Sequence, residues 1–288
     1  MAVTLAESYE VCRRVVAAAG SSFEAGMKLF PADRRDAVYA LYAFFRISDD
    51  LVDDGDEAMR PTLFGAWRDD VLTTLAGAEP NHDCLPAVLD AARRFELPDA
   101  VFVDCLAACA EDLGPVRLAD WAAVDRYCDG VAGTVGEACL RILGDSSEAV
   151  LTLSKVNARA VQLTNIIRDV DEDLERDRVY LPTDLLARHG VGLADLQADP
   201  RPEPLVAALT EAAERAEALY HEAEPLFPLL AGRHRPPIVA MTLRYRELLG
   251  QIRRDGLRAK GRASLNGSSK LGLLASVLAS PWMPTWRR

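Results

Sequence analysis

Two aspartate-rich stretches carry the residue types in this chain that are best suited to chemistry. Asp49 and Asp53 are four residues apart, and Asp169 and Asp173 repeat that spacing much later in the sequence. Residues four apart share one face of an α-helix, so each pair stacks like charges, which destabilises a bare helix by roughly 0.2–0.5 kcal/mol. A positive group must offset this repulsion. If the two helices face one space, four carboxylates supply the oxygen-rich environment that suits Mg²⁺ bound together with substrate phosphates.

Each aspartate pair continues a polar stripe that recurs every three or four residues. The first stripe comprises Tyr42, Arg46, Asp49 and Asp53, and the second comprises Gln162, Asn165, Asp169 and Asp173, with Arg168 beside it. A single acidic run is typical of a solvated charged face. Two runs with the same spacing, each following an apolar segment (37–41 and 160–164), instead favour paired helices that hold a polyanion through a metal.

The elements that position these residues are predicted to be helices. Apolar segments with helical periodicity are found at 85–95, 100–113, 150–170, 205–219 and 238–252, and alternating strand patterns are nearly absent. The breaks between them are mostly short, and half of the 288 residues are hydrophobic, so we expect an all-α fold in a single domain spanning 1–288. The longest connection, 181–204, is either a lid over the site or a simple connector.

Composition excludes several other classes of function. A net charge of −11 argues against nucleic-acid binding. The six cysteines form no CxxC pair, the start has no secretory signal pattern, and no run approaches the ~20 apolar residues of a membrane span, so we expect a cytoplasmic protein. Residues 244–288 include ten Lys and Arg but only two acidic residues. This excess of positive charge indicates an anion site, association with a membrane surface, or a solvated tail.

A glycine-containing run at 131–136 is not interpreted as a nucleotide loop. Its spacing is not GxGxxG, and the preceding residues Tyr127 and Cys128 are predicted to be helical rather than in a strand. Small residues at this spacing permit close helix packing or leave space for a bulky ligand.

Four segments in the same order resemble the squalene/phytoene synthase family. They are 20–23, 42–53, 127–136, and 162–173 with its continuation to 178–182, and the resemblance runs from about 21 to 270. It implies an isoprenoid synthase fold, a helical bundle around a central cavity. It also implies head-to-head condensation of two prenyl diphosphates through a cyclopropylcarbinyl diphosphate.

The resemblance assigns roles to individual positions. The residues implied to hold Mg²⁺, or alternatively Mn²⁺, are Asp49, Asp53, Asn165, Asp169 and Asp173. The residues implied to contact diphosphate are Ser22, Tyr42, Arg46, Arg168, Tyr245 and Arg262. Tyr127 is expected near the reacting carbons. Gln162, Phe23 and Met27 are further candidates for binding the substrate, the last two with Phe30 on one helix face where a prenyl tail ends. Aromatic faces for a carbocation are sought among Phe23, Tyr39, Phe44 and Tyr127, each of which is alternatively a core residue.

Two features of the chain depart from the family pattern. Asp129 stands where members often carry an aromatic residue or His, which we expect to affect the product. No nicotinamide-binding segment is visible, so no NADPH requirement is expected. We predict a transferase that makes phytoene from two geranylgeranyl diphosphates. The alternatives are the same chemistry on farnesyl diphosphate to presqualene diphosphate or dehydrosqualene, cyclisation of one prenyl diphosphate, or a non-catalytic helical protein that binds prenyl diphosphate or metal. The oligomeric state is left open.

Overall fold

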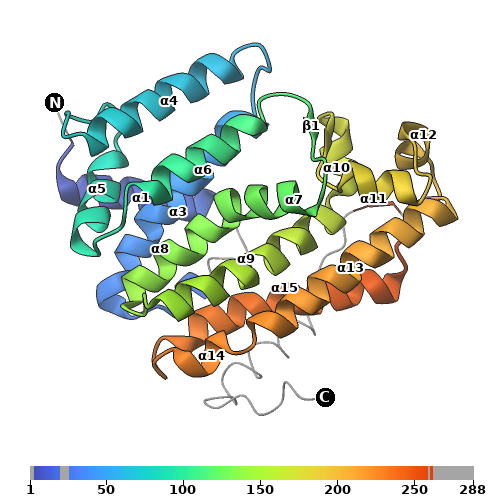
Figure 1. Ribbon diagram of the computed structural model, residues 1–288. Helices are drawn as coiled ribbons and strands as arrows, with labels where there is room; N and C mark the ends of the chain where they lie inside the picture. The colour runs from blue at the N-terminus through green and yellow to red at the C-terminus, as the bar shows by residue number, and fades with distance from the viewer. Residues whose placement is uncertain (1–2, 20–25, 259, 262–288) are drawn as a thin grey trace. The chain divides into compact units, whose positions relative to one another are not determined.

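The computed structural model describes residues 3–19, 26–258 and 260–261, which fold almost entirely into α-helices (Figure 1). The all-α prediction is therefore confirmed. The described chain divides into two compact units, one made of residues 1–113 and 134–151 and the other of 114–133 and 152–288. That all 288 residues form one domain stays a prediction. No helix within the described ranges is both long and apolar enough to cross a membrane.

Unit 1 is built around one long helix. Its helices are α1 (Leu5–Ala19), α3 (Ala32–Asp53), α4 (Arg60–Leu75), α5 (Leu85–Arg94), α6 (Ala100–Glu111) and α8 (Thr134–Leu143). All the others contact α3, which buries an apolar face among them. Phe44 on α3 packs edge-on against Phe102 at 5.1 Å between ring centroids, and Ser48 accepts a 2.9 Å hydrogen bond from Trp67 Nε1. These contacts fix the buried face of α3 close to its aspartates. Phe44 is therefore a core residue rather than an aromatic residue that lines a cavity.

Unit 2 holds the rest of the described elements. Its helices are α7 (Trp121–Cys128), the π-helix η1 (Asp129–Gly133), α9 (Glu148–Arg168, which begins in the last residues of unit 1), α10 (Val170–Glu175), α11 (Thr183–Arg188), α12 (Leu193–Gln197), α13 (Glu203–Ala223), α14 (Leu226–Leu229) and α15 (Arg235–Asp255). The strands β1 (Val116–Arg117) and β2 (Arg178–Val179) pair in parallel, with Val116 opposite Arg178. The glycine-containing run lies in η1 and α8, so the rejection of a nucleotide loop is confirmed.

Two hydrogen bonds, one buried and one partly buried, fix α9 within unit 2. Thr164 and Tyr220 join α9 to α13 through their hydroxyl groups at 3.0 Å, and both residues are buried. Thr242 Oγ1 on α15 donates to Asn157 Oδ1 at 3.1 Å. These contacts matter because the end of α9 carries the second polar stripe.

The connection 181–204 differs from the expected long loop. It contains two short helices, α11 and α12, which together make up nearly half of its length. Arg201 in this segment is buried and pairs with Asp171 of α10 at 2.7 Å, while its backbone N–H donates to the carbonyl of Arg258 at 3.0 Å. These contacts favour the connector interpretation over a lid.

Candidate active site

The first aspartate pair lies at the C-terminal end of α3 in unit 1. Arg46 forms an ion pair with Asp50, one turn further along the helix, and its Nη1 lies 3.7 Å from Asp49 Oδ2. Tyr42, one turn before Arg46, is partly buried. The expected order of aromatic, cation and carboxylates is therefore present on α3. Asp50, which the stripe analysis did not select, is the nearest partner of Arg46.

Asp49 is the most perturbed acid of this pair. Burial, followed by the negative charge of Asp53, raises the pKa of Asp49 to about 7. Its side chain nevertheless keeps 58% of its surface exposed, so water screening reduces the free energy that accompanies this shift. An exposed carboxylate that binds protons this readily is a good partner for a cation, because the cation relieves the repulsion between Asp49 and Asp53.

The second stripe does not lie on one continuous helix. α9 ends at Arg168, and Asp169 caps α10 with φ −100° and ψ 11°. The amide of Asp169 nevertheless donates to the carbonyl of Asn165, and that of Asp173 to the carbonyl of Asp169, both at 2.8 Å. The expected single helix is wrong, but the four-residue spacing of these three oxygen-bearing side chains survives because the hydrogen-bond ladder continues across the break.

Arg168 holds Asp169 with its guanidinium fork. Arg168 Nε lies 2.6 Å from Asp169 Oδ1, and Nη2 bonds the other carboxylate oxygen. The two side chains are only 15% and 17% exposed. Bidentate pairing of this kind is the strong form of a charge-assisted hydrogen bond, and a guanidinium that grips a carboxylate this way is also suited to a phosphate.

Tyr245 joins this cluster from α15. It is 4% exposed, and its hydroxyl is hydrogen-bonded to the side chain of Asn165. Burial raises the pKa of Tyr245 while the positive charge of Arg168 opposes the rise, so the phenol stays protonated at neutral pH. Asn165 Nδ2 also donates to Gln162 Oε1 at 3.3 Å. Four residues chosen from the sequence, Gln162, Asn165, Arg168 and Tyr245, are thus connected within unit 2.

The donor atoms of this cluster fit a divalent cation. Asn165 Oδ1 is buried and accepts no hydrogen bond from the residues that the structure describes, which is costly unless something positive satisfies it. Together with Asp169 and Asp173 it supplies only oxygen, the ligand type that Mg²⁺ prefers. Among the residues that the structure describes, no group of three or more His, Cys, Asp or Glu could hold a metal alone. Mg²⁺ usually takes one or two carboxylates and completes its shell with water and phosphate, so such a group is not required.

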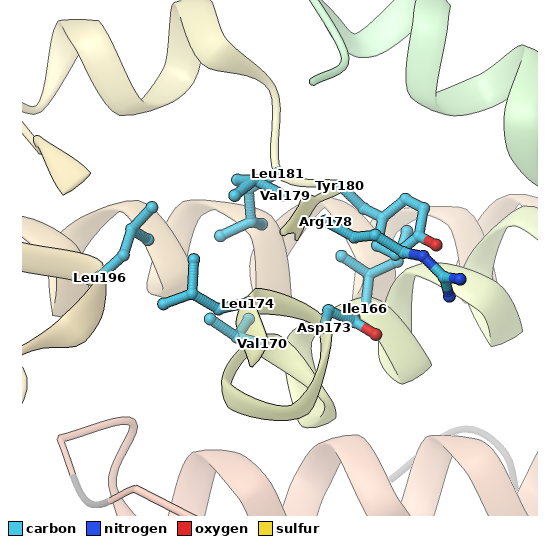
Figure 2. A pocket seen from close by; sticks show the side chains of 9 residues that line it. All are labelled: Ile166, Val170, Asp173, Leu174, Arg178, Val179, Tyr180, Leu181 and Leu196. Atoms are coloured by element: carbon cyan, nitrogen blue, oxygen red, sulfur yellow. The ribbon is translucent and has the colours of Figure 1, made fainter. Parts of the chain in front are cut away.

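Tyr127, at the end of α7, is 6% exposed and stacks on Tyr180 with 4.8 Å between ring centroids. Tyr180 also borders a small hollow, in which Asp173, Arg178 and Tyr180 lie on one side together with Ile166, and the other aliphatic side chains lie opposite them (Figure 2). The hollow has a volume of about 10 Å³, room for about one water molecule. It is therefore too small for a prenyl tail.

Sequence reasoning missed Arg244, which precedes Tyr245 on α15. Arg244 is partly buried, and within the described part of the chain it makes no hydrogen bond or ion pair. Burial lowers the pKa of Arg244, and the positive charge of Arg168 adds to this. Burying a charge is costly unless it is paired, so an anion near these two arginines would be stabilising. Only the adjacency to Tyr245 could have signalled this residue in the sequence.

The remaining candidates near the two ends of the chain have different outcomes. Ser22, Phe23 and Arg262 lie outside the described residues. Met27 and Phe30 are buried, at 3% and 1% exposed, but helix ends at Met27 and a turn follows, so the expected single helix face is wrong.

Comparisons with known proteins show the family to which the chain belongs. The squalene/phytoene synthase family profile matches residues 16–268. The chain is 39% identical to phytoene synthase of Thermus thermophilus, with 91% of this chain and 89% of that protein covered. It is 40% identical to presqualene diphosphate synthase of Zymomonas mobilis over 65% of each chain. A solved dehydrosqualene synthase in complex with ligand matches at a TM-score of 0.85 and 28% identity, with 96% of both chains covered.

The chain therefore belongs to the squalene/phytoene synthase family. It has the helical isoprenoid synthase fold and is a prenyltransferase of isoprenoid biosynthesis. The resemblance stated from four sequence motifs is confirmed, and the non-catalytic alternative is not.

Proposed function

We propose that this prenyltransferase joins two geranylgeranyl diphosphates head to head and releases phytoene, passing through a cyclopropylcarbinyl diphosphate. The observation that carries the proposal is the cluster of Asn165, Arg168, Asp169 and Tyr245, which gathers metal ligands and diphosphate donors within one unit. The phytoene synthase relative, matched over 91% of this chain, supports the C20 substrate.

The chemistry places its main demand on the leaving group. The allylic C–O bond of one substrate breaks and its electron pair leaves with the diphosphate. The double bond of the second substrate attacks the resulting cation, and loss of a proton closes the cyclopropane ring. Cleavage of the second C–O bond, rearrangement and loss of another proton give the hydrocarbon. Preorganised donors such as Arg168 and Tyr245 stabilise the negative charge that develops on each diphosphate.

The aspartates of each unit would hold divalent ions that the leaving group needs. Asp49 and Asp53 in unit 1, and Asn165, Asp169 and Asp173 in unit 2, are the proposed ligands. A bound Mg²⁺ would supply Lewis-acid stabilisation of the departing diphosphate. Arg168 and Arg46 add fixed positive charge whose planar fork suits phosphate oxygens.

Farnesyl diphosphate is the second candidate substrate. The presqualene diphosphate synthase relative is 40% identical, and the ligand-bound dehydrosqualene synthase has the same fold at 28% identity. The reaction at the diphosphates would be the same, so only the length of the space for the tails separates the two substrates.

Product analysis distinguishes the candidates. Purified protein is incubated with C20 or C15 diphosphate and Mg²⁺, and the extract is analysed by mass spectrometry. We expect phytoene from the C20 substrate, turned over at least ten times faster than the C15 substrate. EDTA should abolish the reaction. Faster turnover of the C15 substrate would replace phytoene by the farnesyl alternative, and cyclised single-chain products would refute head-to-head condensation.

We further propose that the protein works in the cytoplasm against the membrane surface. The apolar product gives the physical motive, because release into a bilayer avoids exposing its tail to water. The basic C-terminal segment supplies the attraction to anionic headgroups that such binding requires, although most of it lies outside the described residues.

A further inference from the structure

Four charged side chains of unit 2 form a continuous chain of ion pairs that the proposed reaction does not use. Asp129 accepts hydrogen bonds from Arg159 through both carboxylate oxygens, at 2.7 Å from Nε and 2.6 Å from Nη2. Asp125 accepts from Arg215 at 2.9 Å and lies 3.5 Å from Arg159 Nη1. The guanidinium of Arg215 lies over the ring of Trp121, 4.7 Å from its centroid. These ion pairs connect α7 and η1 to α9 and α13.

The contact between Asp129 and Arg159 lies at a rare backbone feature. Asp129 begins the π-helix η1, and Gly133 ends it. π-turns are uncommon, are usually single turns inserted among α-helical ones, and are frequent at functional sites. A Cβ on Gly133 would lie 3.6 Å from the Cβ of Asp129, so the two ends of the turn are in close contact. The bidentate bond from α9 therefore fixes the position at which the helix changes from α to π.

Tyr127 lies within the segment that these pairs hold. It is two residues after Asp125 and two before Asp129, and both acids are anchored to other helices. Its buried ring stacks on Tyr180 with an interplanar angle of 27°. A π-turn adds about one residue to the helical turn, and one residue corresponds to roughly 100° of rotation. Relaxation of the turn would therefore rotate the Tyr127 ring away from Tyr180.

We propose that Asp129 and Arg159 are positioning residues that hold Tyr127 in register, and that this register sets the fraction of cyclopropylcarbinyl intermediate carried on to the final hydrocarbon. The inference rests on the proposed function and on the expectation, implied by the family resemblance, that Tyr127 lies near the reacting carbons. It gives Asp129 a role other than that of an additional acid beside the substrate, because both of its oxygens already accept hydrogen bonds from Arg159. The departure from the family pattern at this position would then affect the product through geometry.

The test compares Asp129→Asn and Arg159→Lys with a matched control, Glu217→Gln. Glu217 is 30% exposed and accepts a 2.6 Å hydrogen bond from Arg246 between α13 and α15, while Asp129 is 27% exposed. Each variant weakens partly buried ion pairs of unit 2, but only the first two act next to Tyr127. With the C20 and C15 diphosphates, we expect Asp129→Asn to raise the fraction of released cyclopropylcarbinyl diphosphate at least fivefold. KM should change less than twofold, and Arg159→Lys should fall between wild type and Asp129→Asn because it keeps the charge but loses the fork.

Hydrogen exchange gives a readout that does not depend on catalysis. In Asp129→Asn, the amides of residues 121–133 should exchange at least tenfold faster than in wild type, and in Glu217→Gln they should not change. An unchanged product ratio in Asp129→Asn, or an equal change in Glu217→Gln, would overturn the proposal. If the wild type makes no condensation product, the proposed function fails. The positioning role is overturned separately if the amides of residues 121–133 exchange at the same rate in Asp129→Asn as in the wild type.

Discussion

Replacing Asp49 by Asn should remove most of the pH dependence of metal binding. The pKa of Asp49 is raised to about 7, by burial first and by the charge of Asp53 next. A metal ligand must be deprotonated, so the proton and the metal compete for this carboxylate. One pH unit below the pKa only about one tenth of the groups are ionised. The apparent affinity for Mg²⁺ should therefore fall about tenfold between pH 8 and pH 6 in the wild type.

The assay is calorimetric titration of Mg²⁺ with inorganic diphosphate present, at pH 6, 7 and 8. Diphosphate itself titrates near this range, so the informative quantity is the difference between variants. Asp49→Asn should bind Mg²⁺ more weakly at pH 8, and its Mg²⁺ affinity should lose most of its dependence on pH. Asp54→Asn, which changes the exposed residue directly after α3, should keep the pH dependence of the Mg²⁺ affinity. An equal pH dependence of Mg²⁺ affinity in Asp49→Asn and the wild type would refute the assignment of Asp49 as a titrating ligand.

The remaining predictions concern the metal, the anion site, the tail and the membrane. Asp173→Asn should reduce turnover at least ~10²-fold with an unchanged melting temperature, and substantial residual activity would exclude Asp173 as a ligand. Arg244→Ala should raise the Kd for inorganic diphosphate about tenfold, ~1.4 kcal/mol, whereas the exposed Arg253→Ala should not, and equal effects would indicate only general electrostatics. Met27→Phe should shift turnover toward the C15 substrate and Met27→Ala toward the C20 substrate; an unchanged ratio excludes Met27 from setting tail length. Deleting 280–288 should weaken co-sedimentation with anionic liposomes at low salt while preserving turnover of short-tail analogues, and unchanged sedimentation would assign no membrane role to the deleted residues.

The raised pKa of Asp49 also has a consequence for stability. Its value in the folded state lies above the ordinary value of 3.8, so the folded state binds this proton more tightly than the unfolded chain does. The contribution of this group to stability is therefore present at low pH and is lost as the pH rises from about 4 to about 7. The same repulsion that costs stability at neutral pH is what a bound cation relieves.

The helices were predictable because their apolar faces repeat over many turns. Segment 100–113 corresponds to α6 to within two residues, and 238–252 lies within α15, which extends three residues further at each end. The connection 181–204 was interpreted as a loop because its proline and glycine residues interrupt any period. α11 and α12 have only six and five residues, too few to show a hydrophobic period in the sequence.

The candidate site was predictable only along single helices. Arg46 and Asp50 have the i, i+4 spacing of a helical ion pair, so this pair could have been predicted by the rule used for the aspartates. Arg168 and Asp169 are adjacent in sequence, and adjacent residues on a regular helix do not face each other. Their pairing depends on the end of α9 at Arg168, and the apolar pattern, which continues to Val170, does not mark that end.

Contacts between different helices were beyond any periodicity argument, but one physical rule interprets them. Removing a charge from water is costly unless an opposite charge meets it. Where the partner is within the protein, as Arg159 is for Asp129, the pair holds two elements together, and its role is one of position. Where the described structure provides no partner, as for Arg244, the cost remains until an anion binds, and we expect the role to be recognition of an anion. Arg159 and Arg244 are both partly buried arginines of unit 2 and cannot be distinguished by sequence pattern; only the position of the nearest carboxylate separates them.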